Sequence, residues 1–160
     1  MRARRDAGRK RLRNGLEHNN YAQHKEMASQ GSYQMRTMVQ DNEQDYDIDD
    51  GVYFNISDLS DENGNRLDAI SARERVCNSL TYDGRLKIVA VVKDNCVRQK
   101  YPEGYHIDVP VYRIIIDSDA QGNNNERYEL ASKDKWDESD ARAVTRWFNN
   151  IVGRRLNSKI

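Results

Sequence analysis

The sequence predicts an α+β fold in which a mixed β-sheet carries helices mainly on one face. Two observations support this class. Helical apolar spacing occurs near the N-terminus and again over residues 68–82, and β-branched, aromatic-rich segments lie between and beyond these helices. The length of 160 residues is close to that of an ordinary single domain, so we expect one domain over residues 1–160.

The charges of the chain are balanced in total but segregated along it. Lys and Arg number 26, as do Asp and Glu. Residues 1–40 hold nine basic and three acidic side chains, whereas residues 41–68 hold one basic and ten acidic ones. The neutral total argues against a polybasic nucleic-acid coat, and we expect no direct binding to nucleic acid.

Several protein classes are excluded by simple patterns. The longest apolar run, Ile88–Val92, is far shorter than a membrane span, and no apolar segment follows the basic start as in a secretory leader. We therefore expect a cytoplasmic protein with no membrane partner. Cys77 and Cys96 are expected to be reduced thiols, and the three histidines do not cluster with them, so no zinc site is predicted.

The basic N-terminal segment is predicted to be a helix from about Arg4 to Leu16, within a basic region of residues 1–20. Leu12 and Leu16 are spaced i, i+4 and no proline intervenes. Two interpretations stay open. Either the helix is solvated and packs one apolar stripe on the domain, or some of its arginines face a polyanion such as a triphosphate.

The acidic segment leads into a predicted strand at Asp47–Phe54. Side chains two apart in a strand share a face, so Asp47 and Asp49 would project together while Ile48 enters the core. Two neighbouring carboxylates repel each other unless a cation joins them, and Mg²⁺ prefers such oxygen ligands. The alternative is an acidic surface. An EF-hand is excluded, because Asp50 stands where its loop needs glycine.

A Gly-Ser pair precedes this strand, in the segment Gln30–Val39. Gly31 and Ser32 at the entry to a short helix would present backbone N–H groups and a hydroxyl to a phosphate. An ordinary loop with a helix N-cap is the alternative. The segment is not a Walker A loop, because the required lysine pattern is absent.

The second half of the chain alternates between helices, loops and strands. The spacing predicts a helix from Asp68, as N-cap, to Tyr82. The remaining expectations are a loop at Asn55–Arg66, a segment at Leu86–Val92 that fits either a strand or a helix, a loop at Asp117–Asn125, a short strand at Tyr128–Ala131 and a last helix at Glu138–Arg154.

A β-hairpin is predicted between these elements. The strand Asn95–Tyr101 is followed by a turn at residues 102–104 and a long strand, Gly104–Ile116. Asp108 lies in the apolar centre of that strand, where a carboxylate is costly unless it is paired or bound to a metal. Pro110 indicates an edge or a bulge close to it. Together, Gly31-Ser32 and the three aspartates form the set that two-metal nucleotidyl transfer requires.

These motifs resemble the bacterial cGAS/DncV-like nucleotidyltransferases of the polymerase-β superfamily. The resemblance is carried, in chain order, by Arg4–Asp6 with Leu12 and Leu16, Gln30–Tyr33, Asp45–Tyr53, His106–Tyr112, Trp136–Ala141 and Trp147-Phe148. It implies a polymerase-β-like nucleotidyltransferase core and enzymes that make cyclic di- or trinucleotides in anti-phage signalling. The product, rather than a direct contact, would couple the enzyme to its effector protein.

The resemblance also implies the roles of particular residues. Asp47, Asp49 and Asp108 would be catalytic and would bind two Mg²⁺ ions, with Mn²⁺ as an alternative. Gly31 and Ser32 would hold the phosphates of an NTP substrate (ATP, GTP or another), with Gln30 close by. Asp50 would be a supporting or turn residue.

One feature of the family is absent from these 160 residues. Family members continue into a helical C-terminal half that closes over the nucleotides, whereas this chain stops at Ile160. Three hypotheses therefore stay open: a catalytic cyclic-nucleotide synthase, a nucleotidyltransferase-like module that binds nucleotide or a partner without turnover, and an acidic-faced structural domain with no ligand.

Overall fold

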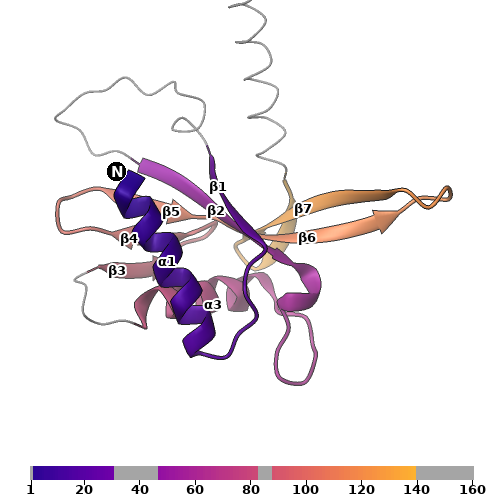
Figure 1. Ribbon diagram of the computed structural model, residues 1–160, viewed down its shortest axis with the longest axis horizontal. Helices are drawn as coiled ribbons and strands as arrows, with labels where there is room; N and C mark the ends of the chain where they lie inside the picture. Colours follow the sequence, from indigo (N-terminus) through magenta and orange to yellow (C-terminus); the bar gives the residue numbers. More distant parts are fainter. Residues whose placement is uncertain (1, 31–46, 83–87, 140–160) are drawn as a thin grey trace, which may run out of the picture.

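In the computed structural model the strands form one mixed eight-stranded sheet, and helices α1 and α3 cover one of its faces (Figure 1). The structure describes residues 2–30, 47–82 and 88–139. The elements are α1 (Arg2–His18), β1 (Glu26–Gln30), β2 (Asp47–Asn55), η1 (Ile56–Asp58), α3 (Ala69–Thr81), β3 (Val89–Val92), β4 (Val97–Lys100), β5 (His106–Val109), β6 (Val111–Ser118), β7 (Asn124–Ser132) and β8 (Lys135–Glu138).

Strand β2 is at the centre of the sheet. It pairs antiparallel with β1 on one side and parallel with β5 and then β6 on the other. The register continues unchanged across the boundary between β5 and β6, because Asp49 pairs with Asp108 and Val52 with Val111. Pro110 separates the two strands, and its carbonyl still accepts a hydrogen bond of 2.9 Å from the Val52 N–H. The prediction of an edge or a bulge at Pro110 is therefore wrong: the proline interrupts the strand without shifting its register, and both β5 and β6 lie between other strands.

The sheet extends by antiparallel pairing from each of these two strands. Strands β3 and β4 continue it from β5, while β7 and β8 continue it from β6. The β6–β7 hairpin projects from the body of the molecule (Figure 1). The predicted hairpin before Asp108 is confirmed by the β4–β5 pairing, in which Arg98 lies opposite Asp108.

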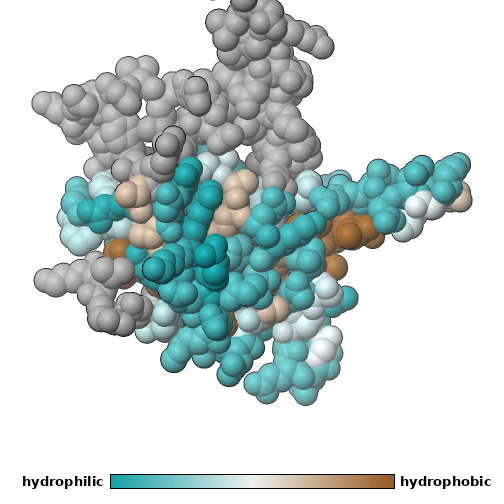
Figure 2. All heavy atoms as spheres, viewed as in Figure 1, coloured by the Kyte–Doolittle hydropathy of each residue, from teal (hydrophilic) through white to brown (hydrophobic). Residues whose placement is uncertain are grey.

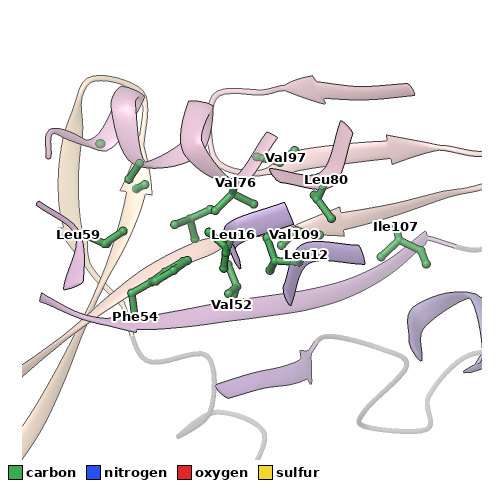
Figure 3. Packing of buried hydrophobic residues seen from close by; sticks show 14 of the residues in the cluster. Leu12, Leu16, Val52, Phe54, Leu59, Val76, Leu80, Val97, Ile107 and Val109 are labelled. Atoms are coloured by element: carbon green, nitrogen blue, oxygen red, sulfur yellow. The ribbon is translucent and has the colours of Figure 1, made fainter. Parts of the chain in front are cut away.

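The main core lies between the helices and the sheet (Figure 3). Leu12 and Leu16 of α1 are fully buried there, which confirms the predicted apolar stripe. Helix α3 contributes Val76 and Leu80, and its Asp68 N-cap accepts a 2.7 Å hydrogen bond from the Ser71 N–H, as predicted. Burial of these side chains in a shared core provides the main driving force for docking both helices.

A second, smaller cluster lies on the other face of β2. Tyr53 and Tyr112 stack with ring centroids 4.6 Å apart, and Tyr128 meets Tyr53 edge-on at 5.5 Å. These rings are almost completely buried, together with Ile114. Because side chains alternate along β2, Asp49 lies on the tyrosine side, while Ile48 and Asp50 lie on the helix side.

Several element boundaries differ from the sequence predictions. The single long strand predicted at Gly104–Ile116 is two strands, because proline has no N–H to donate across the sheet. The ambiguous segment at Leu86–Val92 contains strand β3. Strands β6 and β7 extend into the predicted loop at Asp117–Asn125, and β1 and β8 were not predicted. The predicted short helix after Gly31-Ser32 and most of the predicted helix Glu138–Arg154 lie outside the described residues; Glu138 itself belongs to β8.

The surface of α1 that faces away from the sheet is hydrophilic (Figure 2). In the part of the chain that the structure describes, no helix is both long and apolar enough to cross a membrane.

Candidate functional site

A pocket of about 390 Å³ lies on the sheet face opposite the helices, beside the two tyrosines that stack. Its lining combines two carboxylates with apolar and amide groups, and includes Gln30, Asp49, Cys96, Asp108 and Tyr112. The pocket thus brings together Gln30, Asp49 and Asp108, three residues that the sequence had marked as site candidates from segments far apart in the chain.

The sheet register explains why these residues meet. Gln30 pairs with Asp49, Asp49 pairs with Asp108, and Asp108 pairs with Arg98, so the four residues form one row across β1, β2, β5 and β4. Directly paired residues in neighbouring strands lie about 5 Å apart and point to the same face. The row therefore gathers two acidic groups, one amide and one guanidinium at the pocket.

Asp108 is held by Arg98. The Arg98 Nε donates to Asp108 Oδ1 at 2.8 Å, and Nη2 donates to Oδ2 at 3.0 Å, so both carboxylate oxygens accept from one guanidinium. The Asp108 side chain is 14% exposed and the Arg98 side chain 28%. Such a bidentate pair fixes the carboxylate in one orientation at the pocket wall.

The donors around Asp49 and Asp108 fit a divalent cation. Two carboxylates from directly paired residues line one polar pocket, and their hard oxygens suit Mg²⁺. Among the described side chains no cluster of three potential metal ligands is formed. The third candidate, Asp47, begins β2 and pairs through its backbone with His106, and its side chain lies outside the described residues.

Gln30 has a structural role that the sequence did not indicate. Its Nε2 donates to the Tyr53 hydroxyl oxygen at 2.6 Å, and its Oε1 accepts from the Tyr112 hydroxyl at 3.0 Å. The side chain is 6% exposed and packs over Gly51, where a Cβ would lie 2.4 Å from the Gln30 Nε2. The amide is thus engaged by two tyrosines at the wall of the pocket.

The two other residues predicted to hold phosphate, Gly31 and Ser32, lie outside the described residues. They follow directly after Gln30, the last residue of β1. The hydrogen bonds from Gln30 to Tyr53 and Tyr112 therefore hold the residue that directly precedes this segment.

Asp50 faces the helices rather than the pocket. Arg9 donates to both of its oxygens, and its side chain is 2% exposed. Other α1 arginines also contact the domain: Arg4 pairs with Glu103, Arg5 donates to Ser29, and Arg11 donates to Gln99 at 2.7 Å. Of the two interpretations of the basic helix, these contacts favour the one in which it packs on the domain.

Cys96 lines the pocket, which sequence reasoning missed. Its burial, together with the negative charge of Asp108, raises the pKa of the thiol to about 12. The neutral thiol is a poor ligand for a hard cation, so the carboxylates remain the fitting donors.

Arg98 and Tyr112 were also missed as residues of the site. A signal for Arg98 existed, because the turn centred on Glu103 places residues 98 and 108 opposite each other in a hairpin. Tyr112 carried no comparable signal, since its contact with Gln30 depends on the parallel pairing of β2 with β6.

Comparison with known proteins assigns this arrangement to a family. The model of the family described as "Cyclic GMP-AMP synthase DncV-like, nucleotidyltransferase domain" matches residues 25–112, which contain the whole row of site residues. This match covers more than half of the chain.

Solved structures of the same kind share the fold. The CD-NTase CdnG of Bradyrhizobium diazoefficiens, solved in complex with GTP, is similar with a TM-score of 0.62 at 16% identity over 92% of this chain and 40% of that one. The apo form of Vibrio cholerae DncV gives a TM-score of 0.52 at 29% identity, over 81% of this chain and 35% of that one. Escherichia coli DncV bound to 3'-deoxy GTP gives 0.56 at 28% identity, with the same coverage. The chain thus spans 40% or less of the length of these structures.

Proposed function

The chain belongs to the family of DncV-like nucleotidyltransferase domains, and from this premise we propose that it is the catalytic core of a Mg²⁺-dependent cyclic oligonucleotide synthase. The proposal is carried by the direct pairing of Asp49 with Asp108 on neighbouring parallel strands that line one pocket. Like charges at this spacing repel each other; Arg98 offsets part of that repulsion, and a bound divalent cation would offset more of it.

In the proposed reaction a ribose hydroxyl attacks the α-phosphate of a nucleoside triphosphate. A new O–Pα bond forms, the bond from the α-phosphorus to the oxygen that bridges it to the β-phosphorus breaks, pyrophosphate leaves, and the hydroxyl proton passes to water. Two divalent ions, when bound, would lower the pKa of the hydroxyl and stabilise the leaving pyrophosphate. We assign their carboxylate ligands to Asp47, Asp49 and Asp108.

The segment after β1 would hold the triphosphate. Gly31 would let a phosphate approach the backbone closely, and Ser32 would donate a hydrogen bond to it. Gln30 has its amide engaged by Tyr53 and Tyr112, so we assign it to anchoring this segment more than to contacting the nucleotide.

The titles of related structures name nucleotides, GTP for CdnG and 3'-deoxy GTP for E. coli DncV, which supports NTPs as substrates. We extend to this chain the formation of a cyclic di- or trinucleotide that acts as a second messenger in anti-phage signalling in the cytoplasm. The chain spans 40% or less of the length of those structures, so the activity of a whole synthase is part of this proposal.

The test is to incubate the protein with radiolabelled NTPs and Mg²⁺ and to identify products by mass spectrometry. We expect a Mg²⁺-dependent cyclic product that is lost in Asp49→Asn and in Asp108→Asn. Asp117→Asn is the matched control, because Asp117 is an exposed carboxylate that pairs with Arg127 in the β6–β7 hairpin.

Three outcomes are informative. Product from wild type and Asp117→Asn, with none from the site variants, supports the proposal. Unchanged product from Asp49→Asn or Asp108→Asn overturns it. Nucleotide binding without product, in wild type as in the variants, would identify a binding module that lacks turnover.

A further inference from the structure

The ion pair between Arg98 and Asp108 occupies a carboxylate that the proposed function needs for a cation. Both Asp108 oxygens accept from the Arg98 guanidinium, at 2.8 and 3.0 Å. A cation approaching Asp108 would find only the lone pairs that Arg98 leaves unused, with a positive charge directly beside them. Arg98 and a metal ion are therefore competitors for the same acceptor.

The pair is built into the sheet. Arg98 and Asp108 are direct partners in the β4–β5 register, and the two side chains are 28% and 14% exposed. By contrast, the Arg127–Asp117 pair in the β6–β7 hairpin joins residues that are 37% and 53% exposed. Partial burial weakens the screening by water, so the Arg98 charge acts strongly on the pocket.

Asp49 gives the pair a further electrostatic consequence. Asp108 on β5 lies between two charged neighbours: the Asp49 carboxylate on β2 and the Arg98 guanidinium on β4. With no cation in the pocket, the guanidinium offsets the repulsion between the two carboxylates. When a cation is bound, the same guanidinium adds repulsion instead.

We propose that Arg98 is a positioning residue that keeps Asp108 oriented and charge-balanced before metal binding and whose positive charge opposes the binding of a divalent ion there. This inference rests on the proposed function, since it takes Asp108 as a metal ligand. Arg98 then lowers the affinity of the protein alone for divalent cations, and removing its charge raises that affinity.

The experiment measures Mn²⁺ binding by electron paramagnetic resonance, on the full chain without nucleotide. We expect Arg98→Gln to bind Mn²⁺ more tightly than wild type by on the order of tenfold, which corresponds to about 1.4 kcal/mol. Arg98→Lys keeps the charge but loses the bidentate geometry, so its gain should be smaller and in the same direction. Arg127→Gln, which breaks an Arg–Asp pair away from the pocket, should match wild type.

A double variant separates failure of this inference from failure of the proposed function. In Arg98→Gln/Asp108→Asn the gain in affinity should disappear. If Arg98→Gln binds Mn²⁺ no more tightly than wild type, while Asp108→Asn weakens binding in both backgrounds, the role of Arg98 is overturned and the metal site stands.

If Asp108→Asn leaves Mn²⁺ binding unchanged, the metal site itself is overturned, and the role of Arg98 with it. Circular dichroism and thermal unfolding establish that each variant is folded. Should Arg98→Gln not fold, Arg98→Lys carries the comparison, because its expected change has the same sign.

Discussion

Arg9 of α1 forms a bidentate ion pair with Asp50 on the helix side of β2, the strand that carries Asp49 on its other face. The Arg9 Nε donates to Asp50 Oδ2 at 2.8 Å, and Nη2 donates to Oδ1 at 2.6 Å. Asp50 is 2% exposed on the helix side, while its chain neighbour Asp49 lines the pocket on the other side. The acidic cluster of the sequence is thus divided between two roles, one structural and one directed at the pocket.

The first prediction concerns this pair. Arg9→Ala leaves a buried carboxylate without its cation, so the free energy of unfolding should fall by about 3 kcal/mol in urea titrations. Lys25→Ala is the control, because its pair with Glu126 is 41% exposed on both sides and should cost less than about 1 kcal/mol. Adding Asp50→Asn to Arg9→Ala should recover part of the loss. Equal effects for Arg9→Ala and Lys25→Ala would contradict the structural role of Asp50.

A second prediction concerns the close approach of Gln30 to Gly51. In Gly51→Ala the new Cβ would lie 2.4 Å from the Gln30 Nε2, so the amide should be pushed away from the tyrosine hydroxyls. Overpacking of this kind costs roughly 1–3 kcal/mol of stability. Denaturant unfolding should show that Gln30→Ala relieves part of the Gly51→Ala loss in the double variant. Strict additivity of the two changes would argue against the clash.

The third prediction concerns the contact between α1 and α3. A Cβ on Gly15 would lie 1.8 Å from the Ser79 carbonyl oxygen, which belongs to helix backbone and cannot move aside cheaply. Gly15→Ala should therefore destabilise the domain by about 3 kcal/mol or more, which thermal unfolding would detect.

Gly8→Ala is the matched control for Gly15→Ala in the same helix. Its Cβ would meet only the Gln99 side chain, at 3.3 Å, and alanine favours helix by about 1 kcal/mol over glycine. We expect a change within about 1 kcal/mol of wild type. If both variants are equally stable, the two helices are not packed as closely as described.

The fourth prediction concerns pH. Burial, followed by the nearby charges of Arg13 and Arg9, lowers the pKa of His24 below its ordinary value of 6.5. The His24 Nδ1 is buried with no hydrogen-bond partner among the described residues. Below pH 6.5 the unfolded chain binds this proton more readily than the folded protein does, so stability should fall as pH decreases through that range.

His24→Gln removes this titration and should flatten the fall in unfolding free energy as pH decreases below 6.5. The measurement is urea unfolding at a series of pH values for both proteins. An identical slope in wild type and His24→Gln would assign the pH dependence to other groups.

Much of this fold can be predicted from local patterns. The i, i+4 spacing of Leu12 and Leu16, the cap at Asp68 and the alternation around Ile48 each reflect interactions within a single element. These features depend on neighbouring residues, so the sequence contains them directly. The grouping of Asp49 with Asp108 also followed, from strand alternation and the cost of a carboxylate in an apolar strand, and the family resemblance then gave both residues a role.

The remaining features depend on pairing between distant segments. Strand β1, Glu26–Gln30, is mostly polar and becomes a strand because β2 offers it an edge. The outer part of β7 is exposed and extends because it pairs with β6. The link between Gln30 and Tyr112 joins residues 82 positions apart. No spacing rule within one segment predicts such contacts, because they require the register of the whole sheet.

The attachment of α1 has a consequence for the order in which the molecule forms. Its side chains contact residues far along the chain. Arg9 donates to Asp50, 41 residues further on, Arg11 donates to Gln99, 88 residues further on, and Arg4 donates to Glu103, 99 residues further on. Helix α1 can therefore make its contacts with Gln99 and Glu103 only after the β4–β5 hairpin has been made. Contacts of such long sequence separation slow folding, because a large loop must close before they contribute. The row from Gln30 to Arg98 can therefore be completed only after β4 and β5 have been made.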